Sequence, residues 1–94
     1  MHWVLLAKDR PDAGSIRADT RAEHLDWIAG STDHVVRAGP FLSDDGASML
    51  GSLLIIDFPD RAAAEEWASE DPYAKAGLFE SVTITAWKQT VGPD

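Results

Sequence analysis

The spacing of hydrophobic and polar residues changes several times along this chain, and each change predicts a different element of secondary structure. Apolar or alternating runs are typical of strands, and apolar positions three and four residues apart are typical of helices. The strand pattern covers residues 2–8, 35–42, 49–58 and 79–88, the helix pattern covers 15–29 and 60–70, and one short turn is expected at 72–75. This order predicts a ferredoxin-like βαββαβ fold of the α+β class, a four-stranded antiparallel sheet with both helices on one face.

Turn and capping residues mark several of these boundaries. Asp44-Asp45-Gly46 predicts a hairpin, because Asp-Gly suits a turn that needs a positive φ. Asp60 is the expected N-cap of the second helix, and Gly30 is expected to end the first. Gly51 interrupts the longest apolar run, which predicts a bulge or a close approach to backbone or ligand.

The strand at 49–58 offers apolar residues to both faces of the sheet. Uninterrupted alternation places Leu50, Ser52, Leu54 and Ile56 on one face and Met49, Gly51, Leu53 and Ile55 on the other. Helices cover only one face, so the other would be a large exposed apolar patch. We therefore predict a homodimer that packs sheet to sheet. The 94 residues form one domain, with residues 91–94 as a flexible tail, and domains this small are often marginally stable alone.

Composition narrows the classes of partner and compartment. The net charge of −8 argues against binding to nucleic acid or to an anionic membrane surface. The chain has no cysteine, which excludes disulfides and thiolate chemistry. Its apolar runs are too short for a signal peptide or a membrane span, so we expect a cytoplasmic protein.

His24 is the first candidate for chemistry. It shares one helical stripe with Arg17 and Arg21, because residues three and four apart project together, and Trp27 lies beside it. Imidazole is the usual proton-transfer group near neutral pH, because its ordinary pKa is about 6.5. The two arginines would attract an anionic ligand to the same face. The alternative is a half-exposed histidine on a solvated helix edge, and the sequence leaves both interpretations open.

Asp71 is the second candidate, because Pro72 restricts its backbone and so fixes the direction of its carboxylate. One interpretation is a cap on the short turn that begins at Pro72 and Tyr73. The other is an orienting carboxylate that accepts a hydrogen bond from one nitrogen of His24 and fixes its tautomer. The predicted fold allows the two residues to meet, although the sequence gives no distance.

Other polar and aromatic residues are candidates for the walls of a pocket. Ser52 interrupts an apolar strand face and is interpreted as a hydrogen-bonding residue, since no nucleophile-elbow motif is present. Gly39-Pro40-Phe41 could form one wall, and Tyr73 could contribute its hydroxyl. The three histidines lack the spacing of a metal motif, and no phosphate loop or dinucleotide fingerprint is present, so no metal or cofactor is expected.

Taken together, these residues resemble the YciI-like (YCII) family. The resemblance rests on Arg21-x-x-His24-Leu25, Gly39-Pro40-Phe41, Asp45-Gly46, Gly51-Ser52, Asp71-Pro72-Tyr73, Ala76-Gly77-Leu78-Phe79 and Trp87. It implies a dimeric α+β barrel, in which the sheets of two ferredoxin-like protomers face each other. The characteristic histidine and aspartate of the family fall on His24 and Asp71. Most members lack an assigned reaction, and some relatives eliminate chloride from chlorinated hydroxyquinols.

These observations predict a small cofactor-free enzyme of the lyase or isomerase type. His24 would be the general base or acid, and Asp71 would orient it. Arg17, Arg21 and Ser52 would bind an anionic or phenolic oxygen of a small substrate. Phe41, Trp27 and Tyr73 would shape the pocket. The alternatives are a ligand-binding or accessory protein without turnover, and a structural dimer module in which His24 and Asp71 lie apart.

Overall fold

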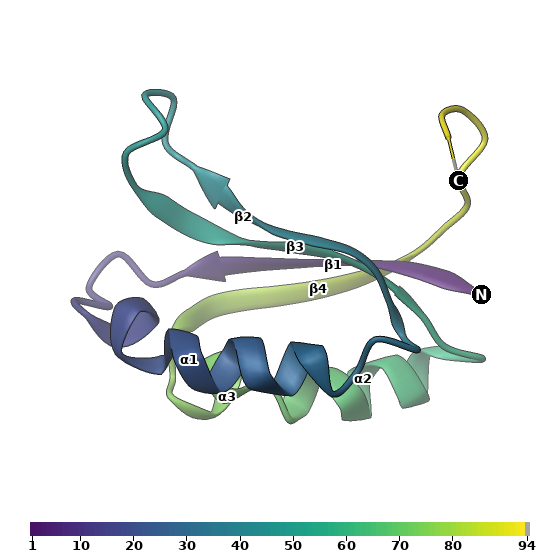
Figure 1. Ribbon diagram of the computed structural model, residues 1–94, viewed down its shortest axis with the longest axis horizontal. Coiled ribbons are helices and arrows are strands. Elements are labelled where there is room, and N and C mark those ends of the chain that lie inside the picture. Colours follow the sequence, from purple (N-terminus) through teal and green to yellow (C-terminus); the bar gives the residue numbers. More distant parts are fainter. Residues whose placement is uncertain (94) are drawn as a thin grey trace.

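The computed structural model describes residues 1–93, which form one four-stranded antiparallel sheet and three helices. The elements are β1 (His2–Asp9), α1 (Ile16–Ala29), β2 (Val35–Leu42), β3 (Met49–Asp57), α2 (Arg61–Ser69), α3 (Pro72–Lys75) and β4 (Phe79–Trp87). The strand order is β2-β3-β1-β4, and all helices lie on one side of the sheet (Figure 1). The predicted ferredoxin-like α+β fold is confirmed. Residues 91–93 of the expected tail have no regular structure, and Asp94 lies outside the described residues.

The hydrophobic core lies between the sheet and the helices. Trp3, Leu5 and Ala7 alternate along β1 toward the helices and are 6 % exposed or less. Leu54 and Ile56 of β3 continue the same layer. Each fully buried apolar side chain of this size contributes about 1.5–3 kcal/mol. β1 is hydrogen-bonded to β3 on one side and to β4 on the other, so the first strand is central.

Capping residues set several of the element boundaries. The side chain of Asp60 accepts a hydrogen bond from the backbone N–H of Ala63 at 2.8 Å, which confirms the predicted N-cap of α2. Gly30 follows α1 directly, with a right-handed φ of −77°. Gly46, in the hairpin between β2 and β3, has the positive φ that the Asp-Gly signal predicts, 74°. None of the helices within residues 1–93 is long and apolar enough to cross a membrane.

A bulge in β3 moves the side chains of its first two residues to the opposite faces of the sheet. Phe41 pairs with Gly51 and Leu42 pairs with Met49, which leaves Leu50 without a partner in the ladder. Met49 therefore faces the helices, and Leu50 faces the opposite side of the sheet. The predicted alternation is wrong at these two positions, because one extra residue shifts a period-two pattern to the other face.

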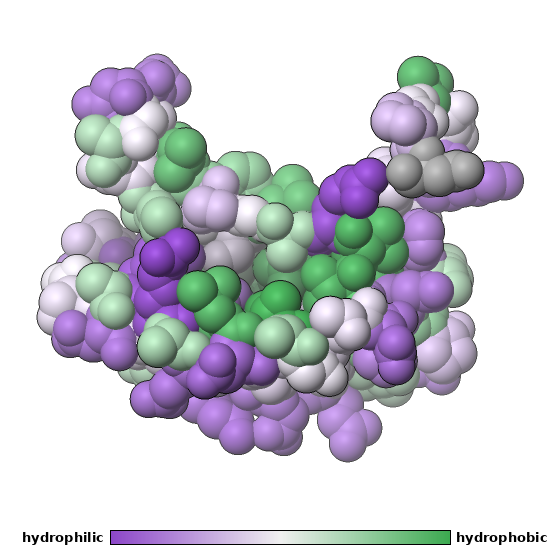
Figure 2. Space-filling model, in the orientation of Figure 1, coloured by the Kyte–Doolittle hydropathy of each residue, from purple (hydrophilic) through white to green (hydrophobic). Residues whose placement is uncertain are grey.

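The sheet face opposite the helices is apolar and uncovered within residues 1–93. Its apolar residues are Val4, Leu6, Phe41, Leu50, Leu53, Ile55 and Trp87. Leu6, Phe41 and Leu50 are 40 %, 42 % and 50 % exposed. The hairpin after β2 and the segment after β4 rise on this side at the two ends of the sheet (Figure 1). Hydrophobic residues gather along the sheet, whereas the lower, helical side is mainly hydrophilic (Figure 2).

Gly51→Ala is expected to destabilise the protein, because the backbone of β1 leaves no room for a side chain. A Cβ at Gly51 would lie 2.3 Å from the carbonyl oxygen of Ala7, which is the close approach to backbone that the sequence predicted. Overpacking costs about 1–3 kcal/mol, which lowers the Tm of a domain this small by at least about 4 °C. Gly39→Ala is the matched control, since a Cβ there meets no atom within 4 Å. Equal Tm values for the two variants in thermal denaturation would contradict this account.

Candidate active site

The carboxylate of Asp71 is fixed at the start of α3. Asp71 is the N-cap of this short helix, and its Oδ1 accepts a hydrogen bond from the backbone N–H of Tyr73 at 2.9 Å. Pro72 occupies the first helical turn, where its fixed φ suits the helix and no N–H is needed. The predicted cap is therefore confirmed, and it holds a buried carboxylate, 6 % exposed, in one direction.

His24 reaches this carboxylate from α1. Its Nδ1 lies 2.8 Å from Oδ1 of Asp71, the same oxygen that caps α3. The imidazole stacks on the ring of Tyr73, with centroids 4.1 Å apart and planes 18° apart. The two interpretations of Asp71 therefore do not exclude each other. A structural module with His24 and Asp71 apart is contradicted by this distance.

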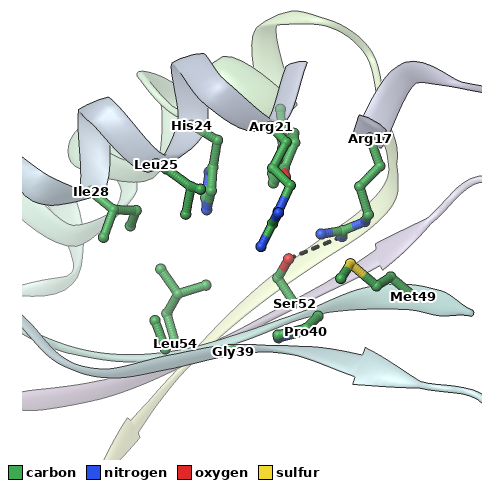
Figure 3. Close-up of a pocket in the computed structure, with 12 residues that line it drawn as sticks. Arg17, Arg21, His24, Leu25, Ile28, Gly39, Pro40, Met49, Ser52 and Leu54 are labelled. Atoms are coloured by element: carbon green, nitrogen blue, oxygen red, sulfur yellow. Dashed lines mark hydrogen bonds between the residues drawn. The ribbon is translucent and has the colours of Figure 1, made fainter. Parts of the chain in front are cut away.

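The hydrogen bond to Asp71 determines which nitrogen of His24 is available. An ionised carboxylate only accepts hydrogen bonds, so Nδ1 carries the proton and donates it. In the neutral ring, Nε2 then holds a lone pair. His24 lines a cavity beside α1 (Figure 3), so its ring borders the space that is open to a ligand.

The cavity has a volume of about 220 Å³ and lies between α1 and the β2–β3 part of the sheet. Its walls are Arg17, Arg21, His24, Leu25, Ile28, Ala38, Gly39, Pro40, Met49, Ser52, Leu54 and Tyr73. A cavity of about 150 Å³ can hold benzene, and drug-sized ligands need roughly 300–1,000 Å³. The space therefore suits one substituted ring. Within residues 1–93, no group of three or more His, Asp and Glu side chains is placed to hold a metal ion.

Arg17 is tied to Asp9 at the end of β1. Its Nε and Nη2 donate to the two carboxylate oxygens at 2.8 and 2.7 Å, and Nη2 also donates to Oγ of Ser52 at 3.0 Å (Figure 3). Burial acts to lower the pKa of Arg17, but the hydrogen bond and charge of Asp9 outweigh it and hold that pKa above its ordinary value. Arg17 thus remains charged and links α1 to two strands.

A family model described as the YCII-related domain matches residues 1–88. The chain belongs to this family. Protein YciI from Escherichia coli O6:H1 is 32 % identical to it, and an uncharacterized protein from Haemophilus influenzae is 30 % identical. Both matches cover 95 % of this YCII-related chain and 98 % of the relative. The resemblance read from the residue pattern is confirmed.

Solved structures support the same assignment. The 5-chloro-2-hydroxyhydroquinone dehydrochlorinase TftG from Burkholderia phenoliruptrix AC1100, in complex with 2,5-dihydroxybenzoquinone, is 30 % identical, with a TM-score of 0.87 and 96 % of each chain covered. An antibiotic biosynthesis monooxygenase has a TM-score of 0.53 at 13 % identity, over 96 % of this chain and 98 % of the other, which shows a shared fold alone. These neighbours are consistent with the dimeric α+β barrel superfamily.

The structure brings most of the predicted site residues of this YCII-related protein together. Arg17, Arg21, His24, Ser52 and Tyr73 line the cavity, and Asp71 holds His24 by its hydrogen bond. Trp27 is not part of the wall. Its ring stacks on Trp67 of α2 with centroids 4.3 Å apart, whereas the ring of His24 is 6.0 Å away. Trp27 therefore joins two helices.

Phe41 also lies away from the cavity, on the open face of the sheet. It pairs with Gly51, and in an antiparallel ladder directly paired residues share a face. Pro40 pairs with Ser52 and supplies the cavity wall instead. Gly39 and Pro40 of the predicted wall segment 39–41 therefore line the cavity, whereas Phe41 does not.

Asp9 is a site residue that the sequence prediction missed. It continues the alternation of Trp3, Leu5 and Ala7, which was a signal that its side chain faces the helices. The pattern was hidden because a polar residue at a strand end is usually assigned to the following loop. Asp9 gives Arg17 its fixed position.

Tyr73 forms a buried platform in the site and is 2 % exposed. One face stacks on His24, and the guanidinium of Arg17 lies 4.8 Å from its ring centroid. Burial raises the pKa of the Tyr73 phenol above its ordinary value, although the positive charges of Arg17 and Arg21 act in the opposite direction. Folding therefore favours the neutral phenol.

The stability of the protein is expected to fall above about pH 10, with Tyr73 as the reporter. The folded-state pKa lies above the unfolded value, so this contribution is complete below the unfolded pKa and is lost as the pH rises through the folded pKa. Tyr73 is the only tyrosine, so the ultraviolet absorbance of tyrosinate titrates it alone. The native protein should ionise at a higher pH than the protein in urea. Coincident midpoints would refute the shift, and Tyr73→Phe is the signal-free control.

Proposed function

We propose that this YCII-related protein is a small cofactor-free enzyme of the lyase or isomerase type, which uses His24 and Asp71 to transfer a proton. The observation that carries the proposal is the 2.8 Å hydrogen bond from Nδ1 of His24 to Asp71 at the wall of a ring-sized cavity. A histidine oriented by a carboxylate is the base–orienter pair used in general acid–base catalysis. Stacking on Tyr73 further restricts the imidazole plane.

The proposed reaction begins when Nε2 of His24 takes a proton from an O–H or C–H bond of the substrate. The bonding electron pair stays on the substrate as an oxyanion or enolate, and Asp71 stabilises the imidazolium that forms. In an isomerase, Nε2 then returns the proton to a different atom. In a lyase, the electron pair expels an anionic leaving group and the proton passes to solvent. General base catalysis of this kind contributes about 10²–10⁴-fold in rate.

The substrate is proposed to be a small aromatic or anionic molecule. The cavity holds about one ring, and its walls carry the positive charge of two arginines and the hydroxyl of Ser52, which suit an oxygen-bearing or anionic ligand. TftG, at 30 % identity, is named as a dehydrochlorinase of a hydroxylated aromatic ring. Hydroxylated rings are therefore the first class to test.

His24→Ala is expected to slow proton transfer strongly while leaving the fold intact. The assay incubates the protein without oxygen in deuterated water, with 2-hydroxyhydroquinone or its 5-chloro derivative. Mass spectrometry and chloride release then measure deuterium incorporation and elimination. The native protein should accelerate one of these reactions, and His24→Ala should slow it by about 10²–10⁴-fold. Asp71→Asn, which leaves the ring without an ionised partner, should also slow it.

His34→Ala is the matched control, because His34 is exposed and stacks on Phe58 outside the cavity. A folded His24→Ala protein with full activity would rule out the mechanism. Binding of these molecules without any chemical change would favour the alternative, a ligand-binding or accessory protein with the same cavity.

We further propose that two copies of the chain pack through the open face of the sheet. Leu6, Phe41 and Leu50 on this face are 40–50 % exposed, and the surrounding apolar residues extend across β1, β2 and β3. A second copy offers the same apolar surface, so the contact is self-complementary. The cavity lies on the helical face, which leaves His24 outside this interface.

Leu6→Asp is expected to convert a homodimer to a monomer, because a carboxylate would be buried without a partner in the interface. Light scattering should give about twice the chain mass of 10.2 kDa for the native protein and the single mass for the variant. Ala62→Asp introduces the same charge at an exposed position of α2, on the helical side of the sheet, and should stay dimeric. A native monomer at micromolar concentration would exclude the dimer.

A further inference from the structure

The two arginines that line the cavity differ in their hydrogen bonds and ion pairs. Nε and Nη2 of Arg17 donate hydrogen bonds to the carboxylate of Asp9, and Nη2 also donates to Oγ of Ser52. Arg21 lies one helical turn further along α1. Within residues 1–93 its guanidinium makes no hydrogen bond or ion pair, and its side chain extends into the cavity toward the sheet (Figure 3).

Arg21 therefore carries the uncompensated charge of the cavity. The charge of Arg17 is matched by Asp9 at 2.7 Å, and the residues that line the cavity include no carboxylate. Asp71 lies behind His24, where its Oδ1 already accepts two hydrogen bonds. In a chain of net charge −8, this leaves a positive interior beside the proton-transfer group.

Ser52 is arranged to donate a second hydrogen bond. Its Oγ accepts the N–H of Arg17 at 3.0 Å, and the side chain is buried on β3, 5 % exposed. A hydroxyl has one proton to donate, and accepting from Arg17 leaves that proton for another partner. Ser52 rises from the sheet while Arg21 descends from α1, so the two project into the same space (Figure 3).

We propose that Arg21 and the hydroxyl of Ser52 bind a single oxyanion of the substrate, so that the cavity selects a small monoanionic ring, a phenolate or a carboxylate. Arg17 is assigned as a positioning residue that acts on this oxyanion only through Ser52. The inference rests on the proposed function for the proton that His24 exchanges with the same ligand. It adds where the negative charge of that ligand lies.

When Nε2 of His24 removes a proton, the electron pair left on the substrate delocalises to an oxygen atom attached to the ring. Fixed donors aimed at such an oxygen stabilise the charge as it develops, because they need no reorganisation. Arg21 would then bind the ionised form of the ligand more tightly than the neutral form.

The test compares ligands that match in shape and differ in charge. Benzoate is paired with benzamide, and 4-nitrophenolate with 4-nitroaniline, in binding titrations by calorimetry or NMR. The native protein should bind at least one anion roughly tenfold to a hundredfold more tightly than its neutral partner, which is the range of a charge-assisted hydrogen bond. The pair that shows this gap identifies the oxyanion as a carboxylate or a phenolate. No gap in either pair would overturn the proposal.

Arg21→Gln should remove the gap without changing the affinity for the neutral ligand. Arg10→Gln is the matched control, since it removes the same charge from an exposed side chain outside the cavity, which pairs with Asp12 at 3.7 Å. A gap that persists in Arg21→Gln overturns the proposal. The tyrosinate titration checks that the native geometry is kept, because losing the positive charge of Arg21 should move the ionisation of Tyr73 to higher pH.

The role of Arg17 needs a variant that folds. Arg17→Gln alone would leave the half-buried carboxylate of Asp9 without its partner, so the double variant Arg17→Gln/Asp9→Asn removes both charges together. In this double variant, the difference in affinity between the anionic and the neutral ligand should fall by no more than it falls in Ser52→Ala, because Arg17 acts through the Ser52 hydroxyl. A larger loss, with the neutral ligand still bound, would show that Arg17 itself contacts the anion and would overturn this assignment.

The binding test and the turnover test can each refute one proposal without refuting the other. An Arg21-dependent gap without turnover in the native protein would refute proton transfer and leave the oxyanion site standing. Turnover that depends on His24 but shows no preference for anions would do the reverse.

Discussion

One carboxylate oxygen, Oδ1 of Asp71, joins the backbone of α3 to a side chain of α1. It accepts the N–H of Tyr73 at 2.9 Å and lies 2.8 Å from Nδ1 of His24. The first contact starts a helix, and the second selects the tautomer of an imidazole. Because the cap fixes the carboxylate, its direction does not depend on the histidine. The position of the carboxylate is therefore set by the local turn at residues 71–73. The same segment supplies Tyr73, whose ring stacks on His24.

The cavity exists because α1 is held to the rest of the molecule mainly by polar and aromatic side chains. None of the fourteen residues of α1 is fully buried, in contrast to the strands beneath it. Arg17 ties its beginning to Asp9, His24 ties its middle to Asp71, and Trp27 stacks on Trp67 near its end. Because these contacts are made by long side chains, they hold the helix about one side-chain length away from the sheet. Close apolar packing would have filled the space that a ligand needs.

The sheet contributes through its register. Gly51 allows the backbones of β1 and β3 to approach so closely that a Cβ would lie 2.3 Å from the carbonyl oxygen of Ala7. The bulge beside it turns Met49 toward the cavity and Leu50 toward the open face. The same strand therefore serves both faces, with Ser52 in the cavity and an apolar surface on the other side.

Local chemistry in the sequence determined the order of the elements, the caps at Asp60 and Asp71, and the close approach at Gly51. Each of these depends on neighbours a few residues apart, where periodicity and backbone preference decide. The stripe of Arg17, Arg21 and His24 was likewise determined by helical spacing. The tertiary structure decided the rest. It placed His24 against a carboxylate 47 residues away and paired Arg17, but not Arg21, with an acid. It also turned Phe41 and Trp27 away from the cavity. Those outcomes depend on the distance at which α1 packs and on one bulged residue, because a shift of one position in a strand moves a side chain to the other face.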